Sequence, residues 1–318
     1  MSINKDSLNI LVTGCGGDIG QSIGKILKES SLFDTVAGCD IQDEHAGIFI
    51  FDNVFTVSKC TSESYRSDLQ EIIDELEIDV ILPASEPELR FLTEHGVEGK
   101  FLDKILISAN LKSREIGFDK LNTVQFLKKK NLPYPKTQVL SEIDAPEFPL
   151  IVKNRSGSGS KSIFKVTDPE EFTYLQHKFS DFIAQEFIDE DSGEYTCGLY
   201  RSRSNGVFRS LIFLRKLTNG YSGYGIIVED PRITDLLHSV AMDLDLDGSI
   251  NVQLRFSGDK PMIFEINPRF SSTVLFRHMF GFKDMIWSLE DSLGLPVSAY
   301  DPPRAGRKFY KGYKEYIL

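Results

Sequence analysis

The chain has 318 residues, of which 41% are hydrophobic and 26% are charged, so it can bury two or three hydrophobic cores. Its net charge of −11 argues against a nucleic-acid-binding protein, since the one lysine run, 128–130, is short. No stretch is long enough for a membrane span, and the apolar run 8–12 is too short for a signal-peptide core. We expect a cytoplasmic protein that has neither a membrane nor a nucleic-acid partner.

The first 110 residues alternate strand and helix patterns. Short apolar runs typical of buried strands lie at 9–13, 35–40, 79–82 and 105–108, and apolar residues recur with a helical period over 65–76. Strands that alternate with helices predict a parallel, doubly wound sheet. We therefore expect an α/β Rossmann-like lobe over residues 1–110.

Two further lobes of α+β type are expected after this sheet. Over 111–183, a helix is predicted at 118–130, two strands at 150–153 and 162–166, and a helix that Asp168-Pro169 opens. Over 184–318 strand patterns dominate, with a helix at about 231–244 and an antiparallel hairpin whose strands are 251–256 and 262–267. The segment 309–316 alternates like a terminal strand, which either closes the core or forms the edge of a homodimer.

A loop rich in glycine and serine follows a lysine in the second lobe. It runs from Lys153 through Ser156, Gly157, Ser158, Gly159 and Ser160. The glycines let the backbone approach a ligand closely, so that several amides can point at phosphate oxygens. The loop departs from a P-loop, since Ser160 replaces the required glycine and a strand follows. Lys153 ends an apolar run and so requires an anionic partner, which favours a polyphosphate over a plain surface hairpin.

The predicted hairpin carries hard oxygen ligands. Glu265 and Asn267 lie on one face of their strand, and Gln253 can lie opposite either of them. Two or three such oxygens, shared with waters and phosphates, suit Mg²⁺, or Mn²⁺ in its place. Arg269 follows directly and can neutralise charge on a transferred phosphoryl group. A polar, solvent-facing hairpin is the alternative interpretation of the same residues.

A further segment suits a nucleoside. Residues 184–188 are extended and can present backbone groups to an adenine edge, and Glu194 can accept from ribose hydroxyls. A plain core strand would explain the same pattern.

In their order along the chain, these residues resemble the ATP-grasp superfamily, in particular its carbamoyl-phosphate-synthase-like branch. The most specific part is Glu265-Ile266-Asn267-Pro268-Arg269, and residues 9–14 and 78–83 resemble the first lobe of that branch. The resemblance implies that Lys120 and Lys153 hold the α- and β-phosphates and that residues 156–160 cover the triphosphate. It also implies that Glu186, Phe187 and Ile188 meet adenine, that Glu194 meets ribose, and that Gln253, Glu265 and Asn267 bind magnesium, with Arg269 at the γ-phosphate.

The function that follows is a stand-alone ATP- and magnesium-dependent ligase. It would join a small-molecule carboxylate to an amine, or to a thiol, through an acyl phosphate, with Arg269 and Lys153 as the catalytic residues. The chain lacks the repeated halves of a full carbamoyl phosphate synthase, so bicarbonate and ammonia are not expected as substrates.

Two alternatives compete with this hypothesis. The glycine loop 14–20 follows a strand, with Asp40 twenty residues later, and imitates a dinucleotide-binding motif, which predicts an NAD(P)-dependent dehydrogenase or epimerase. A glycine-rich helix N-terminus suits any anion, and in the ligase hypothesis this loop lines the acceptor cleft. A non-catalytic nucleotide sensor is the other alternative, although it needs neither a second oxygen ligand nor Arg269.

Overall fold

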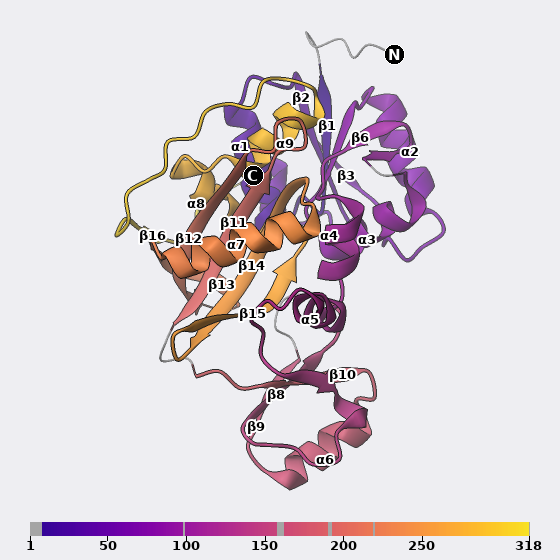
Figure 1. The fold of residues 1–318 in the computed structure, drawn as a ribbon. Helices are drawn as coiled ribbons and strands as arrows, with labels where there is room; N and C mark the ends of the chain where they lie inside the picture. The colour runs from indigo at the N-terminus through magenta and orange to yellow at the C-terminus, as the bar shows by residue number, and fades with distance from the viewer. Residues whose placement is uncertain (1–7, 98, 158–161, 190–192, 219, 318) are drawn as a thin grey trace.

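The computed structural model describes residues 8–97, 99–157, 162–189, 193–218 and 220–317. Three sheets follow one another along the chain (Figure 1). None of the helices in these ranges combines the length and the hydropathy that crossing a bilayer requires.

The first sheet has the strand order β3-β2-β1-β4-β6-β5 and is parallel except for β5. Its elements are β1 (Asn9–Thr13), α1 (Asp18–Glu29), β2 (Thr35–Asp40), the 3₁₀-helix η1 (Ala46–Phe49), β3 (Asn53–Thr56), α2 (Tyr65–Glu75), β4 (Val80–Pro83), α3 (Glu86–His95), β5 (Lys100–Phe101) and β6 (Lys104–Leu106). Successive β1 residues point to opposite faces, so Ile10 and Val12 enter one core and Leu11 enters another. The continuous apolar run in the sequence reflects this double burial, and the predicted doubly wound sheet is confirmed.

The second sheet is small and antiparallel, with the order β7-β10-β8-β9. This part of the chain contains α4 (Leu111–Gly117), α5 (Lys120–Lys129), β7 (Thr137–Val139), the 3₁₀-helix η2 (Leu140–Glu142), β8 (Leu150–Asn154), β9 (Ile163–Val166), α6 (Pro169–Lys178) and β10 (Phe182–Glu186). The Asp168 side chain caps α6 by accepting from two backbone N–H groups, as the sequence predicted. Figure 1 shows β8, β9, β10 and α6 as a separate lobe at the bottom of the view.

The third sheet is antiparallel, with the order β15-β14-β11-β12-β13-β16. Its elements are β11 (Glu194–Arg201), β12 (Phe208–Thr218), β13 (Tyr221–Ile227), α7 (Pro231–Leu244), β14 (Gly248–Ser257), β15 (Lys260–Asn267), α8 (Val274–Met279), α9 (Asp284–Ser292) and β16 (Lys308–Tyr310). Residues such as Cys197, Val252 and Ile266 face α7 and form an apolar core. The opposite face of β11, β14 and β15 carries polar side chains and is therefore where the predicted metal residues lie.

The expected terminal strand is much shorter than the sequence pattern. Only Lys308–Tyr310 pairs with β13, and residues 311–317 form no strand. Lys311 instead forms an ion pair with Asp18 at the start of α1, and the Tyr316 ring stacks on Phe49. The Lys311 backbone N–H still donates to the carbonyl of Gly223 in β13, but no strand continues beyond it, so the prediction of a strand over 309–316 was wrong beyond Tyr310.

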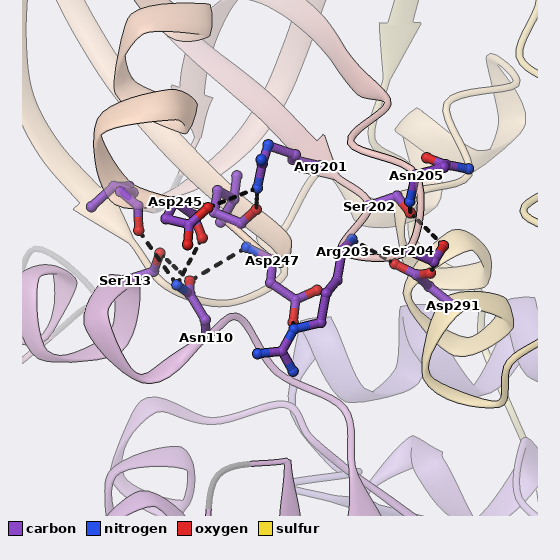
Figure 2. Close-up of polar contacts among 12 residues, drawn as sticks. Asn110, Ser113, Arg201, Ser202, Arg203, Ser204, Asn205, Asp245, Asp247 and Asp291 are labelled. Atoms are coloured by element: carbon purple, nitrogen blue, oxygen red, sulfur yellow. Dashed lines mark hydrogen bonds and ion pairs between the residues drawn. The ribbon is translucent and has the colours of Figure 1, made fainter.

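The lobes share cores and a polar joint. Met285 and Leu289 of α9 pack into the core that covers one face of the first sheet. At the joint, the Asn110 side chain donates to the carbonyl of Asp245, and the backbone N–H of Asn110 donates to the carbonyl of Asp247 (Figure 2). The first sheet is therefore tied to the third by both apolar and polar contacts.

Candidate nucleotide and metal site

The hairpin β14–β15 places the predicted metal residues side by side. Gln253 pairs with Glu265 and Asn251 pairs with Asn267 in the antiparallel register. Cross-strand partners have their Cβ atoms about 5 Å apart, so these four polar side chains form one row. The row offers amide and carboxylate oxygens, which are the ligands that Mg²⁺ prefers.

A β-bulge in β15 alters the alternation that the sequence suggested. The register shifts between Gln253 and Leu254, and the extra residue in β15 is Phe264. Because of the bulge, Ile263 and Ile266 enter the same apolar core although they are three residues apart. The Phe264 ring lies 5.5 Å from the Lys153 Nζ, on the side of the polar row. Strict alternation would have put Phe264 on the other face, so that expectation was wrong.

Lys120 connects the glycine loop to this row. It is the first residue of α5, and its Nζ donates to the carbonyl oxygen of Gly157 at 2.8 Å. The same Nζ lies 3.5 Å from Oε1 of Glu265. Burial alone would raise the pKa of Glu265, but the charges of Lys120 and Lys153 outweigh it and hold that pKa below its usual range. Glu265 is thus an ionised carboxylate at neutral pH.

Lys153 is almost fully buried, with 5% of its surface exposed. Its Nζ donates to Oε1 of Gln185 at 2.9 Å, and Gln185 lies on β10 two residues beyond Ile183, the residue that pairs with Lys153. Burial lowers the pKa of Lys153 to about 8, and the charge of Glu265 offsets part of this effect. The sequence predicted an anionic partner for Lys153. Its hydrogen-bond partner is instead the neutral amide of Gln185, so the positive charge of the lysine is only partly compensated.

The glycine loop begins beside the N-terminus of α5. The Arg155 guanidinium pairs with the Asp119 carboxylate at 2.7 Å, and Ser156 bridges to the backbone of Asp119. Gly157 has φ +96° and lies in open space, so its backbone can face a ligand. Ser158, Gly159 and Ser160 lie outside the described residues.

The adenine segment is located at the end of β10. Glu186 is its last residue, and its carboxylate accepts from the backbone N–H of Lys136 at 3.0 Å. The Phe187 ring lies 3.9 Å from the Lys165 Nζ, and the carbonyl of Ile188 accepts from Arg255. These three residues lie together at the junction of the small lobe and the third sheet, and their contact with adenine stays a prediction.

Glu194 is held by two arginines that the sequence analysis did not connect to it. Arg215 donates to Oε1 at 2.6 Å, and Arg255 donates to Oε2 at 2.7 Å. Burial would raise the pKa of Glu194, but both guanidinium groups together hold it below its usual range. A ribose hydroxyl would have to share oxygens that already accept charged hydrogen bonds. Arg255 follows Asn251 and Gln253 at every second position, and this polar spacing was the signal that could have revealed it.

Arg269 lies just beyond the hairpin. Its Nη1 donates to the carbonyl of Phe270 at 3.0 Å. Burial lowers its pKa and the charges of Glu86 and Glu265 partly oppose this, but a guanidinium remains protonated at neutral pH. Glu86 is the first residue of α3 in the first lobe, and Glu265 belongs to the polar row of the hairpin. Because both charges act on Arg269, this arginine lies between the first lobe and the polar row.

Side chains of the same lobe already contact the glycine loop 14–20 that follows β1. An oxygen of the Asp40 carboxylate accepts from the backbone N–H of Gly16 at 2.9 Å, and a Cβ on Gly16 would lie 2.6 Å from the His45 ring. Cys15, Asp40 and His45 bring three possible metal-ligand atoms within 4.8 Å of one another. However, His45 Nδ1 accepts from the N–H of Gly47, so the neutral ring carries its proton on Nε2, the nitrogen that faces Cys15. That nitrogen is a donor, and the cluster is therefore a poor metal site.

A cavity of about 310 Å³ lies elsewhere, between β12, the start of α7 and Tyr300. Its lining contains none of the residues that the sequence predicted for nucleotide or metal. We therefore locate the candidate nucleotide and metal site by the polar side chains of the hairpin β14–β15, and not by this cavity.

Residues 118–273 match the ATP-grasp domain, and residues 10–104 match the PylC-like N-terminal domain. The chain therefore contains an ATP-grasp domain. This finding confirms the resemblance and the fold class that the sequence predicted.

Several known proteins are similar to this chain. A carbamoyl-phosphate synthase from Methanobrevibacter smithii is 24% identical over 185 residues, which are 53% of this chain and 50% of that protein. The chain thus spans about half the length of this relative.

Solved structures share the fold at low identity. An ADP complex of N5-carboxyaminoimidazole ribonucleotide synthetase has a TM-score of 0.73 at 15% identity, covering 94% of this chain and 80% of that one. An L-amino acid ligase from Bacillus licheniformis has a TM-score of 0.67 at 17% identity, covering 90% and 74%. A biotin carboxylase complex from Campylobacter jejuni has a TM-score of 0.70 at 13% identity, covering 91% and 72%. At such identities the likeness concerns the fold.

Proposed function

We propose that this protein, which contains an ATP-grasp domain, is an ATP- and Mg²⁺-dependent carboxylate–amine ligase that acts through an acyl phosphate. The observation that carries the proposal is the position of Lys120, whose Nζ contacts both Gly157 of the glycine loop and Glu265 of the metal row. Lys120 therefore contacts two segments that are about a hundred residues apart in sequence, which supports their belonging to one site. The names of the similar structures, which include two synthetase or ligase classes, support the same type of reaction.

The donor set fits a hard divalent cation. Glu265 is ionised, and Gln253 and Asn267 add amide oxygens on the same face. Glu265 would hold the ion, with Gln253 and Asn267 completing the protein's share of its ligands. Bound there, Mg²⁺ would neutralise charge on the phosphate oxygens.

The residues of the chain would then position and neutralise the reactants. Lys120 and Lys153 would bind phosphate oxygens, and Arg269 would face the γ-phosphoryl group. An oxygen of the substrate carboxylate attacks the γ-phosphorus, the bond to the bridging oxygen breaks, and ADP leaves. An amine, or a thiol, then attacks the acyl carbon, expels phosphate and loses a proton. No side-chain nucleophile is needed, because the chain would act by positioning and electrostatics.

The remaining assignments belong to the same proposal. We assign the pre-ATP lobe to residues 1–110, the small ATP-grasp lobe to 111–183 and the large lobe with the metal site to 184–318. Adenine would lie against Glu186, Phe187 and Ile188, and residues 156–160 would cover the triphosphate. Ribose would lie near Glu194.

Ligand-dependent melting tests this function against its alternatives. A ligand that binds only the folded protein, at about a hundred times its dissociation constant, adds roughly 2.7 kcal/mol of stability. We expect ADP with Mg²⁺ to raise the melting temperature, and NAD and NADP to leave it unchanged. Stabilisation by NAD alone would refute the proposal in favour of the dehydrogenase hypothesis.

Turnover separates a ligase from a nucleotide sensor. We expect release of ADP to depend on adding both a carboxylate and an amine, screened as mixtures of small acids and amino compounds. Nucleotide binding without ADP release under any mixture would instead favour the sensor.

A further inference from the structure

A short series of hydrogen bonds leads from Lys153 to the beginning of β7. The Lys153 Nζ donates to Oε1 of Gln185 at 2.9 Å, and Nε2 of Gln185 donates to Oγ1 of Thr137, also at 2.9 Å. The Thr137 hydroxyl in turn donates to the carbonyl oxygen of Pro135 at 2.8 Å. Lys153 and Gln185 are 5% and 4% exposed, so their bonds form largely away from water.

The register of the small sheet brings these side chains together. Gln185 is the cross-strand partner of Thr137 on β7, and Ile183, two residues before Gln185, is the partner of Lys153 on β8. Direct and diagonal neighbours on one face lie within reach of long side chains. Val152 points to the opposite face, into the apolar core of this lobe. The hydrogen bonds therefore cross three strands on the face away from that core.

The donors and acceptors fix the direction of each bond. A lysine ammonium can only donate, so the Gln185 atom that faces Lys153 is the amide oxygen. The amide nitrogen then faces Thr137, whose hydroxyl accepts from it while giving its own proton to the Pro135 carbonyl. Thr137 therefore determines which end of the Gln185 amide meets the lysine.

The two groups that touch the ammonium are both neutral. One is the Gln185 amide, and the other is the Phe264 ring on β15, whose centroid lies 5.5 Å from Nζ. An aromatic face attracts a cation without carrying a net charge. Both contacts hold the ammonium in place and leave its charge for the phosphate oxygens of a nucleotide.

The segment at the start of β7 also holds the residue proposed for adenine. The backbone N–H of Glu186 donates to the carbonyl of Lys136 at 2.8 Å, and the Glu186 carboxylate accepts from the backbone N–H of Lys136 at 3.0 Å. Residues 135–137 therefore contact Glu186 directly and Lys153 through Gln185. The proposed contacts to the base and to the phosphates thus share one support.

We propose that Gln185 and Thr137 are positioning residues for phosphate binding by Lys153. This inference rests on the proposed function, since it takes Lys153 as a phosphate ligand. Thr137 turns the Gln185 oxygen toward Lys153, and that oxygen holds the ammonium on the face that meets β15. A carboxylate in place of the amide would also hold the lysine, but its charge would repel the phosphates.

A double-mutant cycle tests whether Thr137 acts through the lysine. The four proteins are the wild type, Thr137→Val, Lys153→Met and the double variant, and calorimetry measures the dissociation constant of ADP with Mg²⁺. We expect Thr137→Val to weaken ADP binding about fivefold or more when Lys153 is present, and by less than about twofold when it is Met. Equal weakening in both backgrounds, or none in the presence of Lys153, would overturn the proposal.

Two further variants separate positioning from a merely structural role. Thr137→Ser keeps the hydroxyl and should restore the affinity that Thr137→Val loses. Gln185→Glu keeps the size of the side chain and an oxygen at Lys153 but adds a negative charge, so ADP binding should weaken by about tenfold or more in the folded protein. This variant decides the question if ADP binding to Lys153→Met is too weak to measure. Wild-type affinity in Gln185→Glu would contradict the need for a neutral partner.

Thr173→Val is the matched control. Thr173 is exposed on α6 in the same lobe, and its hydroxyl donates to the carbonyl of Pro169, so its loss should leave ADP affinity unchanged. A wild-type protein that binds no ADP with Mg²⁺ would refute the proposed function itself. Wild-type affinity in Lys153→Met would refute the phosphate role of this lysine, and both results differ from a failure of the cycle.

Discussion

Lys153 is a buried lysine whose hydrogen-bond partner is neutral, so it is prepared to bind an anion. Its Nζ donates to Gln185, and burial lowers its pKa to about 8, from an ordinary value near 10.4. A buried lysine that lacks a full counter-charge gains it when phosphate oxygens arrive. Phosphate binding should therefore raise the pKa of this lysine and draw in a proton at alkaline pH.

The first prediction concerns the pH dependence of nucleotide binding. In the proposed site the charged form of Lys153 would bind phosphate, so the affinity for ADP should be level below about pH 8 and fall by up to tenfold per pH unit above it. Calorimetric titration of ADP with Mg²⁺ in two buffers of different ionisation enthalpy would show proton uptake above pH 8. Lys153→Arg, which stays charged, should show no such uptake.

The same residue makes a prediction about stability. The folded-state pKa lies below the unfolded one, so the unfolded state binds more protons between pH 8 and 10, and the free energy of unfolding contributed by this group rises over that range. Lys153→Met should therefore melt at a higher temperature than the wild type at pH 7, and the difference should shrink towards pH 10. Thermal melts without ligand at pH 7 and 10 measure it; a variant less stable at pH 7 would contradict the argument.

Glu265 is the residue whose loss should affect turnover most. Its carboxylate is 3.5 Å from Lys120 and is kept ionised by two lysines. We expect Glu265→Gln to lower kcat by at least about 100-fold, the loss typical of removing a group that stabilises transition-state charge. ADP release is the readout, and Glu63→Gln, an exposed position in the first lobe, is the matched control. Wild-type turnover in Glu265→Gln would show that the metal assignment is wrong.

At the scale of elements, the side chains that pack against strand β11 restrict the residue at position 198 to glycine. A Cβ at Gly198 would come within 3.0 Å of Arg277 and Phe282, in a region where neither can retreat without moving a buried group. Local propensity would have favoured almost any other residue at this strand position. The glycine is thus required by packing between elements.

Gly198→Ala should destabilise the fold. Overpacking of this kind costs about 1–3 kcal/mol, to be measured as a lower urea midpoint at unchanged slope. Gly312→Ala is the control, because a Cβ there would meet no atom within 4 Å, and its free energy of unfolding should change by no more than about 0.5 kcal/mol. Equal midpoints for the two variants would mean that β11 can shift to accept a side chain.

At the scale of the whole molecule, helix α9 belongs to the hydrophobic core of the first sheet, although nearly three hundred residues separate it from β1. Met285, Ile286 and Leu289 of α9 pack with Ile10 and Val12 of β1. The lobes are therefore coupled through apolar burial, and the first sheet should lose stability when α9 is weakened.

Leu289→Ala tests this coupling. Leu289 is fully buried, so its truncation should cost about 2–5 kcal/mol, and the amides of β1 should exchange faster with deuterium. Leu217→Ala, at a position 45% exposed, should change neither quantity appreciably. Unchanged exchange in β1 would indicate that the first sheet is stable without α9.

The sequence by itself determined whatever depends on short-range periodicity and local capping. Apolar runs in β1 and β4, the Asp168 cap of α6, the approximate bounds of α7 and the hairpin β14–β15 were all predictable, because neighbouring residues decide them. The structure then decided that Gln253 lies opposite Glu265 rather than Asn267. The ATP-grasp resemblance rests on such segments.

Only the tertiary structure decided which distant groups meet. The contact of Lys120 with Glu265, the two arginines on Glu194, the bulge at Phe264 and the packing of α9 against β1 join residues that are far apart in the chain or in different elements. The free energy of these contacts comes from burial and charge pairing in the assembled fold, which no local pattern encodes. For this reason the sequence predicted which residues form the candidate site, and the fold determined which groups they contact.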